Sequence, residues 1–192
     1  AAAGGEVPGI LARALTAVCE GQIAEIESVA NPERDTSEYL NTIKLKTATL
    51  FRAATELGAS TSETDPEQRL ALVSYGESFG LAFQLVDDLL DVVGSPHVTG
   101  KVPGTDLREG VFTLPMLIAS ERDPSLRNRL ARGERDLDRI MPVLQSTGAV
   151  EATLQEAKSY ASRAVAALDP LPDSEWRAAL EGLVDGVLAQ VA

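Results

Sequence analysis

The stretch from Gly80 to Asp91 constrains the fold of this chain more than any other part of the sequence. It lies in a long apolar segment without proline, yet it carries Gln84, Asp87, Asp88 and a final Asp91. These positions are spaced i, i+3, i+4 and i+7, which places them on one stripe of an α-helix. Neighbouring carboxylates repel one another, and burying a charge is costly without a counter-ion. The pattern therefore predicts a helix whose polar stripe faces a bound cation such as Mg²⁺.

A solvated acidic face is the alternative interpretation of this stripe. It is less consistent with the intervening positions, which hold large apolar side chains. These are Phe83, Leu85, Val86, Leu89 and Leu90. Hard cations prefer carboxylate and water ligands, and Mg²⁺ commonly bridges protein carboxylates to substrate phosphates. This local pattern therefore favours a metal-binding stripe over a solvent-exposed acidic face.

The composition favours helices and excludes several classes of protein. Apolar residues make up 44% of the chain and are mainly Ala, Leu and Val, whereas aromatic residues make up only 4%. A net charge of −12 argues against a nucleic-acid partner and against general attraction to anionic membranes. A single cysteine excludes an internal disulfide framework and favours the cytoplasm. No apolar run reaches the roughly 18 residues of a membrane-spanning helix, so we expect no transmembrane segment.

Helical periodicity continues along the whole chain, and no stretch alternates like a strand. We predict an all-α fold in a single domain over residues 1–192. The expected helices cover residues 7–30, 39–57, 66–93, 113–120, 124–131, 135–145, 150–168 and 174–191. Thr36 or Ser37 is expected to cap the second helix, and Gly58 to follow its end. Residues 94–110 are rich in Gly and Pro and predict a long loop, which in a compact domain is typically functional.

A few further residues stand out as candidates. Lys46 shares an apolar helical stripe, so its ammonium group either reaches the surface or points into a polar cavity. Lys101 lies in the Gly-rich loop, where a mobile lysine can close over phosphate. His97, the only histidine, has no nucleophile or second histidine arranged around it, so we interpret it as a loop residue. Cys19 and Trp176 are expected to be buried packing residues.

In combination, these residues resemble the C-terminal part of a trans-isoprenyl (polyprenyl) diphosphate synthase. The matching pieces occur in the order expected for that family. They are Gly21-Gln22, Lys46-Thr47-Ala48, Leu50-Phe51, Tyr75-Gly76, Gly80 to Gln84, Asp87 to Asp91, Gly100-Lys101, Gly104 to Gly110 and Thr113-Leu114-Pro115. The resemblance extends over residues 7–120, and its specificity lies in the ordered combination.

The resemblance implies a helical bundle around a central cavity and a Mg²⁺-dependent condensation. In that reaction isopentenyl diphosphate attacks an allylic prenyl diphosphate, giving a longer trans-polyprenyl diphosphate. Carried over by position, Asp87 would bind Mg²⁺, with Asp88 and Asp91 binding it or holding its waters. Lys46 and Lys101 would bind the allylic diphosphate. Thr47 and Gln84 would line the site of the allylic cation, and a homodimer would be the expected assembly.

Two departures from the family pattern stand beside the resemblance. The family carries a first aspartate-rich motif that these 192 residues do not contain, so we expect this chain alone to be inactive, or to pair with a chain that supplies the missing half. Asp136-Leu137-Asp138 has the wrong spacing for that motif and is interpreted as a solvated helix face. Position 111 is Val where many relatives have Lys.

Two alternatives to the prenyltransferase function remain open. The chain could be a non-catalytic or regulatory subunit of a heteromeric prenyl synthase, or a class I terpene cyclase.

Overall fold

The computed structural model describes residues 5–62, 64–94 and 102–191, and every regular element in these ranges is a helix. The helices are α1 (Val7–Glu27), α2 (Thr36–Ile43), the π-helix η1 (Lys44–Ala48), α3 (Thr49–Thr61), α4 (Pro66–Val93), α6 (Thr105–Glu109), α7 (Leu114–Arg122), α8 (Pro124–Ala131), α9 (Leu137–Ser146), α10 (Ala149–Ala167), α11 (Glu175–Leu188) and the 3₁₀ turn η2 (Ala189–Val191). The predicted all-α fold is therefore confirmed.

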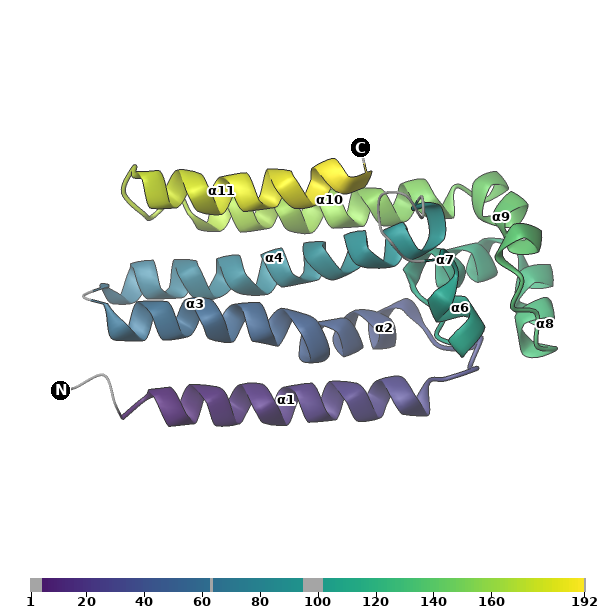
Figure 1. Ribbon diagram of the computed structural model, residues 1–192, viewed down its shortest axis with the longest axis horizontal. Coiled ribbons are helices and arrows are strands. Elements are labelled where there is room, and N and C mark those ends of the chain that lie inside the picture. Colours follow the sequence, from purple (N-terminus) through teal and green to yellow (C-terminus); the bar gives the residue numbers. More distant parts are fainter. Residues whose placement is uncertain (1–4, 63, 95–101, 192) are drawn as a thin grey trace.

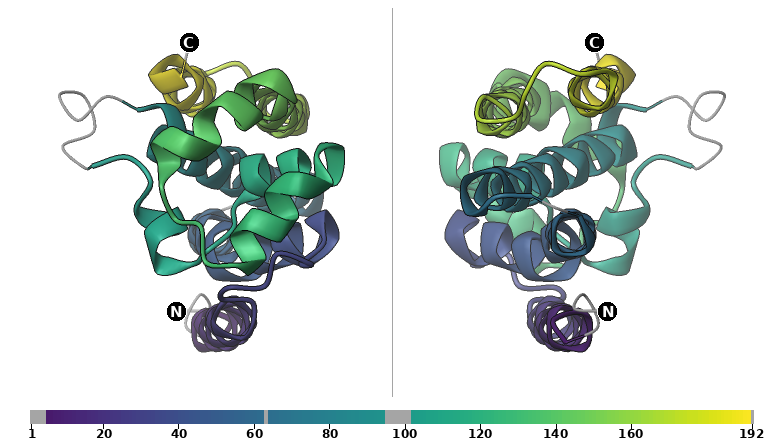
Figure 2. Two further views of the ribbon diagram at one scale, coloured as in Figure 1. Left: turned by 90° about the vertical axis from the view of Figure 1, so that its right-hand side faces the viewer. Right: turned by 90° about the vertical axis from the view of Figure 1, so that its left-hand side faces the viewer.

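The long helices are stacked in layers with α4 near the centre. Across the long axis, α1 forms one outer layer, α2 to α3 the next, then α4, and finally α10 with α11, while α6 to α9 gather at one end (Figure 1). The end views show α10 and α11 side by side and α1 at the opposite edge (Figure 2). α4 contacts α3 on one side and α10 on the other. Contact with helices on both sides explains why apolar residues are buried along most of its length, from Ala71 to Val92.

The second predicted helix differs from expectation at both ends and in its middle. Asp35, rather than Thr36 or Ser37, is the N-cap, because its carboxylate accepts the backbone N–H of Glu38 while the Glu38 carboxylate accepts the backbone N–H of Asp35. The helix continues past Gly58 to Thr61. Between α2 and α3, η1 forms one wide π-turn, a feature that often marks a functional site.

The predicted loop over residues 94–110 contains a short helix, α6. Gly104 and Gly110 flank it, both with φ of 81°, a left-handed conformation that a side chain strains. The side chain of Asp91, at the end of α4, accepts the backbone N–H groups of Thr105 and Asp106 at 3.0 and 3.1 Å. α6 is thereby attached to the end of the carboxylate helix. The predicted residues His97 and Lys101 lie outside the described residues.

Two expected packing residues are instead at the surface. Cys19 is exposed on α1, and Trp176 is 74% exposed at the start of α11. Both predictions of burial were wrong, because each residue lies on a helix face that has no neighbouring helix in the described structure. None of the described helices is both long enough and apolar enough to cross a membrane.

Candidate functional site

A polar cleft of about 290 Å³ opens where the end of α1 meets η1, α4 and α6. Its lining combines five carboxylates, two cations and several neutral groups. The lining residues are Glu25, Arg34, Tyr39, Thr42, Ile43, Lys46, Thr47, Gln84, Asp87, Asp88, Asp106, Glu109, Val111 and Thr113. We refer to this set as the cleft. It brings together Lys46, Thr47, Gln84 and the first two aspartates of the predicted stripe.

Lys46 reaches the cleft because η1 is held tightly between two glycines. A Cβ on Gly21 of α1 would lie 2.7 Å from the Lys46 backbone nitrogen, and one on Gly80 of α4 would lie 2.5 Å from Ala48 Cα. From this position the Lys46 ammonium group donates to both carboxylate oxygens of Glu25, at 2.7 and 2.9 Å. Of the two orientations predicted for Lys46, the structure has the one that faces a polar cavity.

Thr47, Gln84 and Asp88 form one hydrogen-bonded chain across the cleft floor. The Thr47 hydroxyl donates to Gln84 Oε1 at 2.7 Å, and Gln84 Nε2 donates to Asp88 Oδ1 at 2.8 Å. The phenol of Tyr39 donates to the other oxygen of Asp88. These bonds fix the orientation of the Gln84 amide, since its oxygen and nitrogen each have a defined partner.

The three predicted aspartates have three different environments. Asp88 is buried, and burial raises its pKa to about 7, although the hydrogen bonds from Tyr39 and Gln84 act in the opposite direction. Asp87 is exposed and lines the cleft, and it accepts a long hydrogen bond from Gln84 Nε2 at 3.5 Å. The carboxylate of Asp91 accepts hydrogen bonds from two backbone N–H groups of α6. Asp87 and Asp88 both line the cleft, whereas Asp91 is not among its lining residues.

Asp106 supplies a carboxylate to the cleft that sequence reasoning did not single out. It lies in the first turn of α6, and its pKa is raised to about 6 by burial and then by the charges of Asp91 and Asp87. The repulsion between Asp87 and Asp106 is the kind that a bound cation relieves. No three Asp, Glu, His or Cys side chains among the described residues form a metal cage by themselves. Two carboxylates facing one cleft fit Mg²⁺, which takes its other oxygen ligands from water and phosphate.

Three more cleft residues escaped the sequence analysis as site candidates. Glu25 lies within the first predicted helix, and the amide of Gln22 donates to it at 3.2 Å. Tyr39 was predicted only as the first residue of a helix, and Arg34 lies between the first two predicted helices. Only the pairing of distant segments reveals them, since Lys46 and Glu25 are 21 residues apart and Tyr39 and Asp88 are 49 apart.

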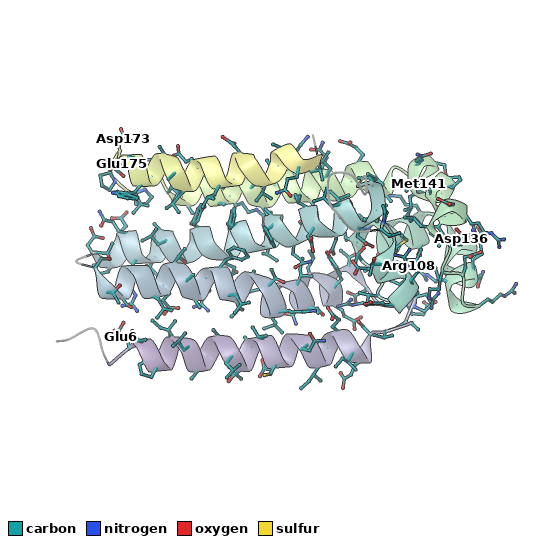
Figure 3. The ribbon with its side chains drawn as sticks, viewed as in Figure 1. Glu6, Arg108, Asp136, Met141, Asp173 and Glu175 are labelled. Atoms are coloured by element: carbon teal, nitrogen blue, oxygen red, sulfur yellow. The ribbon has the colours of Figure 1, made fainter. Side chains whose placement is uncertain are left out.

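The acidic pair Asp136 and Asp138 lies elsewhere, as predicted. Both residues are exposed, and Asp136 caps α9 by accepting the backbone N–H of Asp138 at 3.1 Å. Figure 3 shows Asp136 at the end of the molecule formed by α8 and α9. Arg108 of α6 is held by the segment that precedes its helix, donating to the carbonyl oxygens of Pro103 and Val102 at 2.8 and 3.1 Å.

The Tyr39–Asp88 bond gives a stability prediction. Replacing Tyr39 by Phe is expected to lower the free energy of unfolding by about 2 kcal/mol, because a buried carboxylate loses a donor. Tyr75→Phe is the matched control. Its phenol donates to a neutral acceptor, the Leu180 carbonyl, at 2.8 Å, and its loss should cost about 1 kcal/mol. Urea unfolding measures both changes, and a Tyr39 loss no larger than that of Tyr75 contradicts the prediction.

Comparison with known proteins places these features in context. Residues 4–146 match the family described as polyprenyl synthetase. The chain is 35% identical over 181 residues to octaprenyl diphosphate synthase of Escherichia coli, covering 91% of this chain and 56% of that protein. It is 33% identical over 179 residues to heptaprenyl diphosphate synthase component 2 of Bacillus subtilis, covering 91% of this chain and 51% of that protein. The chain thus spans about half the length of these curated relatives.

Solved structures give the same picture. A polyprenyl synthase from Caulobacter crescentus, complexed with calcium and isoprenyl diphosphate, superimposes with a TM-score of 0.91 at 38% identity. The match covers 98% of this chain and 60% of that one. A decaprenyl diphosphate synthase from Rhodobacter capsulatus superimposes with a TM-score of 0.90 at 35% identity, covering 97% of this chain and 60% of that one.

Proposed function

Because the chain belongs to the polyprenyl synthetase family, we propose that it is the part of a Mg²⁺-dependent prenyltransferase that binds the allylic diphosphate. The protein would condense isopentenyl diphosphate with an allylic prenyl diphosphate to make a longer trans-polyprenyl diphosphate. The observation that carries the proposal is the convergence of Lys46, the Thr47–Gln84–Asp88 chain and Asp87 on one cleft. A Caulobacter relative is described in complex with calcium and isoprenyl diphosphate, which supports a cation and a diphosphate as ligands.

In the proposed mechanism, the residues of the cleft bind and orient the diphosphate. Lys46 exchanges its partner Glu25 for a phosphate oxygen, and we propose that Lys101 adds a second positive charge. Asp87 would hold Mg²⁺, with Asp88 and Asp91 binding it or its waters. The ion, when bound, supplies positive charge that stabilises the departing diphosphate. Asp106 is a further carboxylate in reach of the same cleft.

Thr47 and Gln84 would face the carbon from which the diphosphate departs. Both are neutral and polar, and the fixed Gln84 amide presents a dipole where positive charge develops. A carbonyl-type oxygen can stabilise an allylic cation without reacting with it as rapidly as water would. Tyr39 holds Asp88, and so indirectly Gln84, in one orientation.

The assembly and location are also part of the proposal. We propose that residues 1–192 belong to one domain, because one cluster of buried residues extends from Tyr39 to Val187 and a smaller one joins Ile10 and Ala14 of α1 to Ala53 of α3. Exposed Leu11, Leu15 and Ile26 on α1 support pairing with a second copy or with another chain. A monomeric mass in light scattering contradicts that pairing. Cell fractionation tests the proposed cytoplasmic location.

Product analysis tests the proposed function directly. The protein encoded by the complete reading frame is incubated with farnesyl diphosphate, labelled isopentenyl diphosphate and Mg²⁺. We expect longer labelled prenyl diphosphates, and complete loss of product when EDTA removes the metal. The 192 residues alone are expected to give no elongation. Elongation by this chain alone contradicts the last expectation, and a cyclic hydrocarbon product contradicts the proposed reaction in favour of a terpene cyclase.

One relative favours a second arrangement. Its name, heptaprenyl diphosphate synthase component 2, describes a protein that works as one of several components. If this protein is likewise one component, the complete reading frame gives no product until a second component is added. Activity of the isolated product of that reading frame contradicts this arrangement.

A further inference from the structure

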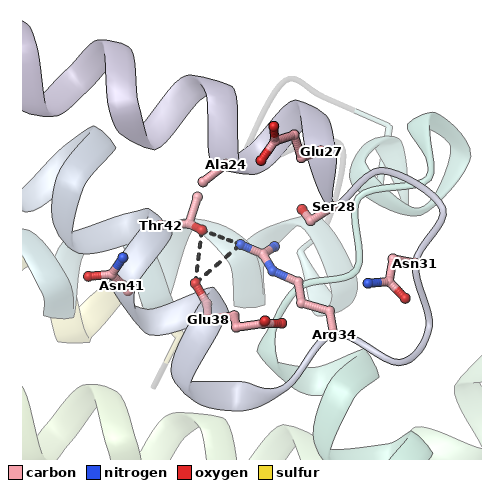
Figure 4. Close-up of a pocket in the computed structure, with 8 residues that line it drawn as sticks. All are labelled: Ala24, Glu27, Ser28, Asn31, Arg34, Glu38, Asn41 and Thr42. Atoms are coloured by element: carbon pink, nitrogen blue, oxygen red, sulfur yellow. Dashed lines mark hydrogen bonds between the residues drawn. The ribbon is translucent and has the colours of Figure 1, made fainter.

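Arg34 is a buried cation on the wall between two cavities. It lies in the turn between α1 and α2, is only 6% exposed, and lines the cleft described above. It also lines a neighbouring cavity of about 250 Å³ together with Ala24, Ser28 and Asn31 (Figure 4). Arginine is almost never buried to this degree without a charged partner, so its surroundings need an explanation.

The protein satisfies this guanidinium group only in part. Nη2 donates to the Thr42 hydroxyl and, at 3.5 Å, to the Glu38 carbonyl, as Figure 4 shows. Nε is buried and has no hydrogen-bond partner in the described part of the chain. Within the described residues, no carboxylate oxygen lies within 4.0 Å of Arg34 to form an ion pair; the Glu38 carboxylate instead accepts the backbone N–H of Asp35. The nearest compensation is the Tyr39 ring, 5.5 Å from Cζ.

The rest of the cleft makes this unpaired cation informative. Among its described lining residues, only Lys46 and Arg34 carry positive charge, and Lys46 is already bound to both oxygens of Glu25. Burial also lowers the pKa of Arg34, so its surroundings stabilise the cation poorly. A planar guanidinium group with an unused Nε–H matches the paired oxygens of a phosphate better than any other protein side chain does.

We propose that Arg34 is a further diphosphate-binding residue, whose guanidinium group lines the cleft without a carboxylate partner among the described residues and binds phosphate oxygens of the substrate there. This inference rests on the proposed function, because it requires a diphosphate there. It adds a ligand from the α1–α2 turn to the cations already assigned. Thr42 would be a positioning residue, since its hydroxyl accepts a hydrogen bond from Nη2 and so fixes the orientation of the guanidinium group.

A purely structural role for Arg34 makes the opposite stability prediction. If Arg34 balances the carboxylates of the cleft, removing its charge destabilises the protein without ligand. If it is held ready for a ligand, removing an uncompensated buried charge raises the melting temperature of the ligand-free protein. Arg34→Met keeps much of the volume and removes the charge, so the sign of its melting-temperature change separates the two roles.

The test is calorimetric titration of the chain with Mg²⁺ and inorganic pyrophosphate, alongside thermal unfolding. Losing charged hydrogen bonds in Arg34→Met should weaken pyrophosphate binding by about tenfold or more. Arg34→Lys should recover only part of that affinity, because lysine keeps the positive charge but lacks the planar guanidinium group that can bind two phosphate oxygens at once. Arg139→Met is the matched control: Arg139 is 71% exposed and pairs with Asp136 on the surface, so its loss should leave binding unchanged.

Lys46→Met separates failure of this inference from failure of the proposed function. Loss of binding in Lys46→Met with unchanged affinity in Arg34→Met overturns the role of Arg34 and leaves the cleft as a diphosphate site. Absence of binding by the unaltered chain overturns both. A lower melting temperature of ligand-free Arg34→Met, with unchanged affinity, assigns Arg34 to the structural role. If Arg34→Met does not fold, Thr42→Val provides the same comparison, because it releases Nη2 while leaving the charge in place.

Discussion

Replacing Asp87 by Ala in the complete protein is expected to lower the rate of prenyl transfer by about 10²-fold or more, since the change removes charge stabilisation at the leaving diphosphate. Among the described residues, Asp87 is the predicted metal ligand whose side chain accepts the fewest hydrogen bonds, and it lines the cleft. The variant should also need a higher Mg²⁺ concentration for half-maximal rate. Steady-state kinetics over a Mg²⁺ titration measures both effects.

Stability separates this catalytic effect from damage to the fold. Because Asp87 is exposed and, among the described residues, makes only one long side-chain hydrogen bond, at 3.5 Å, Asp87→Ala should change the free energy of unfolding by no more than about 0.5 kcal/mol. Asp185→Ala, at an exposed position on α11, is the matched control and should leave the rate unchanged. Unchanged turnover in Asp87→Ala defeats the assignment of Asp87.

Asp88 and Asp91 show where sequence reasoning reaches its limit. Spacing on a helix depends only on local geometry, so the shared stripe was predictable. Which oxygen faces a ligand depends on distant segments: Tyr39 binds Asp88, and the backbone of α6 binds Asp91. For the same reason Lys46 was predictable as a candidate, whereas its partner Glu25 was not.

Helix boundaries likewise were predictable where local sequence sets them and not where contacts between distant segments set them. Breaks at Asp65-Pro66 and Asp123-Pro124 were predictable because capping is local, and both aspartates cap the helices that follow. The π-turn of η1 was not predictable, because it depends on the fit between helices rather than on its own residues. The predicted burial of Trp176 and Cys19 was wrong for a similar reason. Helical periodicity identifies the face on which a residue lies, but not whether another helix covers that face.

The fit around η1 leads to the second large prediction, Gly80→Ala. A Cβ at position 80 would lie 2.5 Å from Ala48 Cα and 3.0 Å from the Phe51 ring, so α4 and η1 must separate. Alanine favours a helix over glycine, yet the clash with backbone should outweigh that gain and lower the free energy of unfolding by about 2 kcal/mol. Urea unfolding measures this loss.

Gly58→Ala is the matched control, because the same substitution on α3 meets no atom within 4 Å. There only the helix preference acts, so stability should rise by about 0.5–1 kcal/mol. Opposite signs for one chemical change would show that contact with η1, not glycine itself, decides the outcome. Gly80→Ala should also reduce pyrophosphate binding, because moving η1 separates Thr47 from Gln84 and displaces Lys46. Equal stability changes in the two variants would contradict the tight α4–η1 contact on which the cleft geometry depends.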